Sequence, residues 1–390
     1  MRPWRFVVWF GIVSLLADFV YEGARSVTGP LLASLGASAA VVGAVTGAGE
    51  AAALVLRLVS GPLADRTGRF WGLAIGGYAL TVVSVPLLGA VGTLAAACVL
   101  VVAERVGKAV RSPAKDTLLS HATASTGRGR GFAVHEALDQ VGAVIGPLTV
   151  AAVLAATNSY GPALGVLAVP GAASLALLWW LHRRVPDPSA YETVLHAEPL
   201  HPGTRWSARE PLPRAFWAYA VFTAATMTGF TTFGVLSFHI VHRHLLPVST
   251  VPVLYAGAML AAAAAALVSG WLYDRVGPRT LAVLPVLAAV VPALAFTGRL
   301  PAVVVGTLVW GAAMGVQEST LRATVADLVP TPRRATAYGM FAAVVGAATF
   351  AGGFLTGALY AVSVPALVAT VIAVQAAALF VLAAVRPHRT

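Results

Sequence analysis

The sequence contains few charged residues and almost no cysteine. Charged residues make up 11% of the 390 residues, whereas a soluble domain is about a quarter charged. Cys98 is the single cysteine, which excludes an internal disulfide and a cysteine-based metal centre. A GxxxxGK[ST] phosphate loop and an HExxH pair are both absent, so we expect no direct use of ATP, no metal and no cofactor.

Apolar residues, in contrast, are abundant. They make up 58% of the chain, and the mean hydropathy is +0.82. The long apolar blocks predict membrane-spanning helices, because an open sheet edge cannot be satisfied in lipid. We expect an all-α membrane protein with twelve transmembrane helices, over residues 5–34, 39–63, 70–89, 93–118, 131–156, 160–182, 215–242, 250–273, 279–297, 301–327, 335–360 and 363–385. The first block has no small-residue cleavage site, so no cleavable signal peptide is expected.

The arginines are distributed unevenly between the two sides of these helices. The formal net charge is +11, and 24 of the 26 basic residues are arginine. Seventeen arginines fall in the tails and in the loops on the same side, whereas two, Arg243 and Arg299, fall on the other side. This asymmetry is typical of cytoplasmic loops, so we expect both termini in the cytoplasm and no nucleic-acid partner. The preference for arginine over lysine suggests a GC-rich bacterial genome and hence a bacterial cytoplasmic membrane.

One short pattern occurs twice in the sequence. GPLADRTGRF, from Gly61 to Phe70, recurs 209 residues later as GWLYDRVGPR, from Gly270 to Arg279. Between the copies lies the one long polar connection, which is rich in proline and carries mixed charge. The sequence therefore predicts a duplicated architecture with a six-helix bundle at 1–182, a cytoplasmic linker at 183–214 and a second six-helix bundle at 215–390.

The repeated turn, the six-plus-six helices and the central loop together resemble the major facilitator superfamily over essentially the whole chain. GPLADRTGRF is similar to the family's signature between its second and third helices at nearly every defining position. Glu104-Arg105-Val106-Gly107 matches a fourth-helix motif in part, and Gly142-x-x-x-Gly146-Pro147 resembles an antiporter motif. Leu148 and Thr149 stand where that motif continues with glycines. The resemblance implies a monomeric transporter that works by alternating access.

The repeated turns predict a conformational latch at the cytoplasmic face. Each acid can lie against the positive N-terminus of a helix from the other half, Asp65 near Arg334 and Asp274 near Arg130. The arginines of each turn would pair with an acid at the end of the fourth or the tenth helix. These contacts require a closed cytoplasmic side, although charged turns also follow from the positive-inside rule alone. The predicted latch comprises Asp65, Arg66, Arg69, Asp116, Asp274, Arg275, Arg279 and Asp327.

Charged residues inside the predicted helices are candidates for function, because each is costly in lipid unless it is paired or hydrated. They are concentrated in the first half, where Glu104, Lys108, Arg111 and Lys115 line one face of the fourth helix. Burial favours the neutral form of a carboxyl group and a nearby cation favours the charged form. The candidates for proton coupling are Glu22, Asp18, Asp139 and Glu136. The alternative is that these acids form ion pairs that only hold helices together.

Aromatic and polar side chains in four of the helices predict a binding site for an amphipathic small molecule. The candidate substrate-binding residues are Tyr21, Arg25, Arg105, Lys108, Arg111, Phe230, Phe233, Gln317, Glu318 and Arg322. Helix packing is the alternative for the two phenylalanines. Lys108 can lose its proton when it is buried, which an arginine cannot do.

We expect a secondary transporter that exports a small molecule in exchange for protons. The alternatives are proton-coupled uptake or facilitated transport of a small organic anion, which the intramembrane cations favour, and a non-transporting receptor or scaffold of the same fold. A membrane enzyme is disfavoured because the sequence offers no set of nucleophile or metal residues. The expected partners are a small-molecule substrate, protons and the lipid bilayer.

Overall fold

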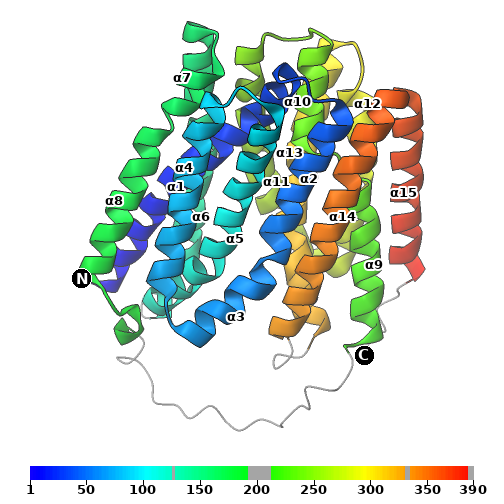
Figure 1. Cartoon of the computed structure of the whole chain (residues 1–390). Helices are drawn as coiled ribbons and strands as arrows, with labels where there is room; N and C mark the ends of the chain where they lie inside the picture. Colours follow the sequence, from blue (N-terminus) through cyan, green and yellow to red (C-terminus); the bar gives the residue numbers. More distant parts are fainter. Residues whose placement is uncertain (125–127, 192–211, 330–333, 385–390) are drawn as a thin grey trace. The chain divides into compact units, whose positions relative to one another are not determined.

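The computed structural model describes residues 1–124, 128–191, 212–329 and 334–384 (Figure 1). In this part of the chain there are helices and connecting turns and no strand. The expected all-α membrane fold is therefore confirmed. The predicted linker falls largely on residues 192–211, which lie outside the described part.

The first part of the chain, up to the linker, forms α-helices that follow the predicted spans closely. They are α1 (Pro3–Ser34), α2 (Ala39–Val55), α3 (Arg57–Thr67), α4 (Phe70–Ala90), α5 (Leu94–Ala124), α6 (Arg128–Thr157), α7 (Tyr160–Gly165) and α8 (Ala168–Arg184), followed by the short 3₁₀ helix η1 (Pro188–Tyr191).

The second part, after the linker, is also helical throughout its described residues. It contains α9 (Arg214–Thr228), α10 (Phe233–His242), η2 (Val248–Thr250), α11 (Val251–Val276), η3 (Gly277–Ala282), α12 (Val283–Ala295), α13 (Leu300–Leu328), α14 (Arg334–Val362) and α15 (Val364–Ala384).

Three of the predicted spans consist of two helices each, and each still forms one apolar segment able to cross a membrane. Residues 39–63 divide into α2 and α3, residues 160–182 divide into α7 and α8, and residues 215–242 divide into α9 and α10. The last interruption covers Gly229 to Thr232, and the Thr232 hydroxyl accepts a hydrogen bond from the Val235 amide at the start of α10. A threonine in this position caps a new helix.

The number of membrane-crossing helices agrees with the twelve expected. By length and composition, the described residues include ten apolar segments able to cross a membrane. One of them, Val248–Ala295, is 48 residues long and contains both α11 and α12. Helix α5, with 31 residues, is long enough to span but is too rich in charge to count among the ten.

In each of the two repeated turns, a glycine with a positive φ ends a helix. Gly68 has a φ of 62° and its amide donates to the Ala64 carbonyl at 2.9 Å, which ends α3. Gly277 has a φ of 65° at the end of α11. These left-handed conformations are readily adopted by glycine and disfavoured for residues with a Cβ atom.

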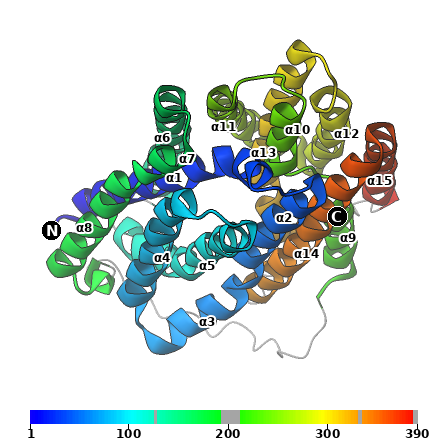
Figure 2. The same ribbon diagram turned by 45° about the horizontal axis from the view of Figure 1, so that its top comes forward.

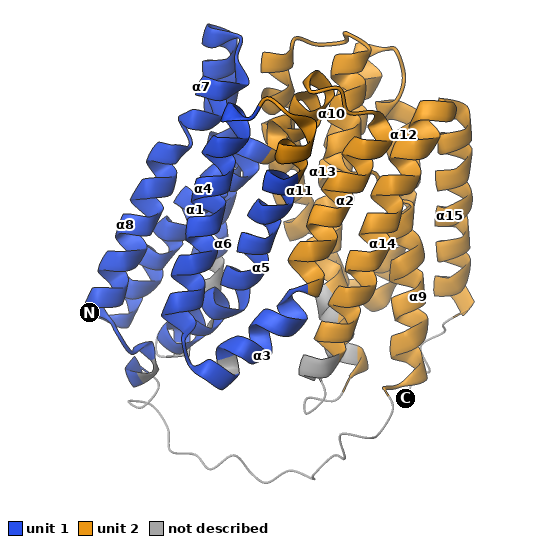
Figure 3. Cartoon of the chain, viewed as in Figure 1, with its two compact units in different colours: residues 1–24, 56–91, 99–210 blue, residues 25–55, 92–98, 211–390 orange. Residues whose placement is uncertain are grey.

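The chain divides into two compact units (Figure 3). Unit 1 comprises residues 1–24, 56–91 and 99–210, and unit 2 comprises residues 25–55, 92–98 and 211–390. Residues 25–55, which the sequence assigns to the first bundle, thus pack within unit 2. The division into bundles at 1–182 and 215–390 stays a prediction.

Helix α2 joins unit 2 through its close packing on α14, which Figure 2 shows beside it. A Cβ atom added to Gly43 would lie 2.0 Å from the Gly353 carbonyl oxygen. Small residues allow such an approach between helix backbones in a membrane. The close approach of Gly43 to Gly353 therefore explains why α2 packs within unit 2.

Candidate functional site

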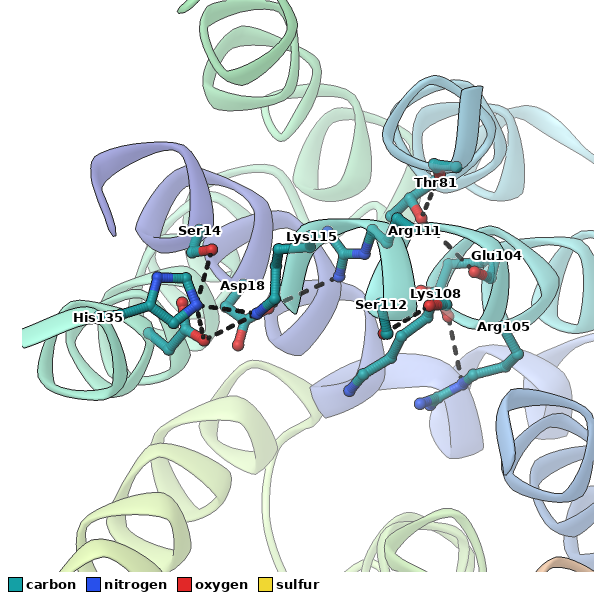
Figure 4. Close-up of polar contacts among 12 residues, drawn as sticks. Ser14, Asp18, Thr81, Glu104, Arg105, Lys108, Arg111, Ser112, Lys115 and His135 are labelled. Carbon is teal, nitrogen blue, oxygen red and sulfur yellow. Dashed lines mark hydrogen bonds and ion pairs between the residues drawn. The ribbon is translucent and has the colours of Figure 1, made fainter. Parts of the chain in front are cut away.

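The candidate site lies in unit 1, where α1, α5 and α6 bring their charged faces together (Figure 4). Glycines on α6 set the distance to α1. A Cβ atom on Gly142 would lie 2.2 Å from the Leu15 carbonyl oxygen, and one on Gly146 would lie 2.1 Å from that of Phe19. The Gly-x-x-x-Gly motif thus allows the two backbones to touch, and this contact brings the polar residues of α1 close to those of α6.

The first element of the site is an ion pair between α1 and α5. Asp18 Oδ1 lies 3.7 Å from Arg111 Nη2, and 5% of the Arg111 side chain is exposed against 23% of that of Asp18. The Arg111 guanidinium also lies over the Tyr78 ring of α4, 4.4 Å from its centroid. Arg111 is therefore held by an acid on one helix and by an aromatic ring on another.

The second element is a cluster of four side chains from the same three helices. Lys115 Nζ lies 2.9 Å from His135 Nε2 and 3.6 Å from Asp139 Oδ2. The same histidine nitrogen lies 3.3 Å from the Ser14 hydroxyl. His135 and Asp139 are i and i+4 on α6, so the helical repeat places them on one face. Both are buried, with 4% and 9% of their surfaces exposed.

The third element is an aromatic ring that carries two cations. The Arg105 guanidinium lies 4.4 Å from the centroid of the Tyr21 ring, and Lys108 Nζ lies 3.7 Å from it. Arg105 Nε also pairs with Glu104 Oε2 at 3.2 Å. The Tyr21 hydroxyl is buried and has no hydrogen-bond partner among the described residues. Cations are attracted to the negative face of a ring.

The remaining proton-coupling candidates have different surroundings. Glu22 is buried on α1. Glu136 is exposed on α6, where its Oε1 accepts a hydrogen bond from Gln140 Nε2 at 3.3 Å, so it does not join His135 and Asp139.

The substrate-binding candidate Arg25 pairs with Glu50 at 3.0 Å within unit 2, between α1 and α2.

The predicted substrate residues of the second half are only in part grouped together. Phe230 and Phe233 are buried and stack around Trp310, with ring centroids 6.4 and 5.3 Å from it. Such a compact aromatic cluster is consistent with packing. Gln317 is half-buried and Glu318 is exposed. The side chain of Arg322 lies outside the described part.

The described latch residues are exposed and have not formed the expected pairs within unit 1. Arg66, Arg69 and Asp116 are exposed, and no ion pair among the described side chains joins either arginine to this acid. In unit 2, Asp274, Arg275 and Arg279 are exposed, and the Arg275 guanidinium lies 3.9 Å from the centroid of the Trp271 ring. The side chains of Asp65 and Asp327, and those of the first residues of α6 and α14, lie outside the described part.

The sequence interpretation did not foresee the role of His135 or of Lys115. His135 stands beside the predicted Glu136 in the sequence, but the face it shares is that of Asp139. The spacing in the sequence did indicate which residues share a helix face. Lys115 lies on the same face of its helix as Lys108 and Arg111, and Ser14 and Asp18 are i and i+4. Which faces meet could not be read from the sequence of any one helix.

The cluster does not have the geometry of a hydrolytic triad. In a Ser-His-Asp triad, the serine and the acid contact opposite nitrogens of the imidazole. Here Ser14 and Asp139 both face Nε2, and Nδ1 has no hydrogen-bond partner among the described residues. A nucleophile in this arrangement could not be activated by a relay through the ring. No group of three side chains in the described residues could hold a metal ion.

These observations define a multi-pass helical membrane protein with charge inside the membrane. The profile of the Major Facilitator Superfamily matches residues 10–259 and 223–390. The chain therefore belongs to the major facilitator superfamily, as the sequence resemblance indicated, and its class is that of membrane transporters.

Individual relatives and solved structures support this assignment. An uncharacterized protein of Mycobacterium tuberculosis, Rv2265, is 64% identical over 392 residues, which cover 100% of this chain and 95% of that protein. An uncharacterized MFS-type transporter of Methanocaldococcus jannaschii, MJ1317, is 23% identical over 357 residues, covering 90% of this chain and 88% of that one.

Solved transporters share the fold at low sequence identity. The crystal structure of the nucleoside transporter NupG (D323A mutant) has a TM-score of 0.78 at 14% identity and covers 98% of this chain and 100% of its own. A POT family transporter in complex with 5-aminolevulinic acid has a TM-score of 0.75 at 12% identity and covers 98% and 95%. At these identities the likeness is one of fold.

Proposed function

We propose that this transporter exports a small molecule across the bacterial cytoplasmic membrane in exchange for protons. The observation that carries the proposal is a pair of carboxylates in unit 1, Asp139 buried and Asp18 half-buried, each beside a cation on another helix. Asp18 faces Arg111, and Asp139 faces Lys115. Buried charges in a membrane protein mark ion and substrate pathways.

The chemistry of these pairs suits a coupled cycle. A carboxylate beside a cation stays ionised, and it takes up a proton when the cation moves away in a low-dielectric site. Alternating access supplies such a movement. Asp18 and Glu22 on α1 are the first candidates to carry the proton. They lie on the same face of α1 as Tyr21 and Arg25.

The orientation and the latch belong to the same proposal. The excess of arginine on one side supports cytoplasmic termini, and the mycobacterial relatives support a bacterial membrane. The repeated turns would stabilise the state that is closed to the cytoplasm. The protein would work as a monomer.

Proton release on substrate binding tests the proposal. Purified protein in weakly buffered detergent receives lipophilic cations, neutral drugs and organic anions in turn, while a dye reports the pH. We expect one class to release protons, and Asp18→Asn or Glu22→Gln to abolish the release while binding persists. Binding without proton release in the wild-type protein would contradict antiport. A non-transporting receptor would retain its response in both variants.

Uptake of an organic anion is a second candidate, favoured by the position of Arg105 and Lys108 over Tyr21. Two cations on one ring offer a carboxylate or phosphate group two charge-assisted hydrogen bonds, and the ring offers an apolar surface. In proteoliposomes with an inward proton gradient, uptake of a labelled anion that Lys108→Gln abolishes would favour this function over export.

A further inference from the structure

We propose that His135 and Asp139 form a proton-binding site in which a proton and the ammonium group of Lys115 compete for the same place. The inference deepens the proposed proton-coupled transport and rests on it. The competing cation comes from α5, the proton acceptor and its counter-ion come from α6, and Ser14 of α1 closes the group (Figure 4).

The position of the hydrogen atoms follows from the contacts of one nitrogen. His135 Nε2 is met by Lys115 Nζ at 2.9 Å, by the Ser14 hydroxyl at 3.3 Å and by Asp139 Oδ2 at 3.5 Å. A lysine ammonium group only donates, so Nε2 accepts and the imidazole is neutral with its hydrogen on Nδ1. That Nδ1 atom is buried and has no hydrogen-bond partner among the described residues.

A second cation cannot be added without displacing the first. A proton that binds to Nε2 makes an imidazolium ion 2.9 Å from the ammonium group, and two like charges at this distance repel strongly in a buried site. One carboxylate is the counter-ion available to both cations, because Asp139 Oδ2 lies 3.6 Å from Lys115 Nζ and 3.5 Å from His135 Nε2. Asp139 therefore balances the charge of either cation and not of both together.

The exchange is complete with the groups present. A proton from solution forms the N–H bond at Nε2 of His135. Lys115 keeps its own protons and withdraws from Nε2, while Asp139 stays ionised and pairs with the imidazolium ion. Release reverses each step. Because Lys115 stands on α5 and both His135 and Asp139 stand on α6, binding of the proton replaces a contact between two helices with an ion pair within one helix.

The other charged groups around the cluster act on Asp139 and on Lys115. The other charged groups that act on Asp139 are Asp18 and Arg111, which pair with each other, and the exposed Glu136. Lys115 also senses Tyr78 and the exposed Asp116. The remaining neighbour of the imidazole is the Phe10 ring, with ring centroids 6.4 Å apart. Among the described acids, Asp139 alone lies within ion-pair distance of His135.

Nitrogen-15 NMR of histidine in the purified full-length protein tests the competition without any substrate. The His135 resonance is assigned by its loss in His135→Asn. Lys115→Met removes the competing charge, so we expect His135 to bind a proton at least about ten-fold more tightly than in the wild-type protein. Lys115→Arg keeps the charge and should leave the affinity for the proton close to that of the wild type.

Two outcomes would overturn the proposal. One is an unchanged titration of His135 in Lys115→Met. The other is a protonated-carboxyl infrared band in Lys115→Met that Asp139→Asn removes, because the proton would then sit on the acid. Should Lys115→Met fail to fold, the wild-type protein gives the answer, since the chain has only two lysines and the Lys115 resonance must shift at the pH at which His135 is protonated.

The test separates this inference from the proposed function. One combined outcome is competition at His135 in the titration while substrate binding releases no protons. That combination would support the proton-binding site and contradict antiport. Proton release that persists in His135→Asn and is lost in Asp18→Asn supports antiport and places the coupling proton elsewhere.

Discussion

At the scale of single residues, Tyr21 is notable because its ring carries two cations while its hydroxyl group is buried without a hydrogen-bond partner among the described residues. The ring therefore matters more to this site than the hydroxyl group does. The Tyr78 ring also carries a cation, because it lies under the Arg111 guanidinium. Aromatic faces keep these cations in an apolar environment that would otherwise exclude them.

Substitution of Tyr21 separates the two parts of the side chain. Tyr21→Phe keeps the ring, so thermal stability should stay within about 1 kcal/mol of the wild-type protein, because the hydroxyl has no hydrogen-bond partner in the described part of the chain. Tyr21→Leu removes both cation–ring contacts, and we expect a loss of roughly 1–3 kcal/mol. Unfolding in detergent followed by tryptophan fluorescence measures both. Equal losses in the two variants would show that the hydroxyl group carries the effect.

At the scale of elements, the interruption between α9 and α10 frees backbone groups that the membrane cannot satisfy. Helix α9 ends at Thr228, and the Thr226 carbonyl accepts a hydrogen bond from Gln375 Nε2 of α15 at 2.9 Å. Gln375 is 1% exposed. A buried backbone carbonyl without a partner is costly in lipid, so one glutamine on a distant helix stabilises the broken one.

The same substitution at two glutamines tests this account. Gln375→Leu leaves the Thr226 carbonyl unsatisfied, and we expect the free energy of unfolding to fall by about 1–3 kcal/mol. Gln140→Leu is the matched control, because Gln140 bonds only the exposed Glu136 in the described structure and should change stability by less than about 0.5 kcal/mol. Equal melting temperatures of the two variants would contradict the role given to Gln375.

Close helix contact is the second property of the elements that can be tested. A Cβ atom on Gly146 meets the Phe19 carbonyl at 2.1 Å, whereas one on Gly76 of α4 has open space within 4 Å. Gly146→Ala should therefore push α1 away from α6 and destabilise the protein by roughly 1–3 kcal/mol. Gly76→Ala should be neutral or stabilising by up to about 1 kcal/mol. Thermal unfolding compares the two variants. An unchanged stability of Gly146→Ala would contradict the explanation by close helix contact.

At the scale of the whole molecule, the repeated turns are the feature that addresses the conformational cycle. Their exposed arginines and their left-handed glycines are in place in each unit. The proposed contacts of Asp65 and Asp274 join the two halves of the chain, so they depend on the state of the transporter and not on either unit alone.

Neutralising one of these acids should shift the population of states. Asp274→Asn removes an interaction of about 1 kcal/mol with a helix N-terminus, which changes the ratio of two states roughly five-fold. Spin labels at the ends of α4 and α12 next to the turns, in a Cys98→Ser background, measure the distance between them. Arg299→Gln, on the opposite side of the predicted topology, is the control and should leave the distances unchanged. Unaltered distances in Asp274→Asn would show that the charged turns set the membrane topology and do not act as a latch.

The sequence by itself determined the helical membrane class, the spans and the repeat, because hydropathy, arginine placement and a duplicated turn are local properties of the chain. It did not predict the interruption at Gly229, although Gly229, Thr231 and Thr232 are poor helix formers, because hydropathy marks the whole segment as one span and the compensating Gln375 lies far along the chain. Nor could it assign residues 25–55 to unit 2, because the partner of Gly43 stands on α14.

Only the tertiary structure decided which charged faces meet. The sequence placed Asp139 and Glu136 on α6 as equals, and the packing of α1 and α5 on one side of that helix buried the first with Lys115 and left the second exposed. The physical reason is that a helix fixes the spacing of its own side chains through its 3.6-residue repeat, whereas the electrostatic surroundings of each one depend on the neighbouring helices.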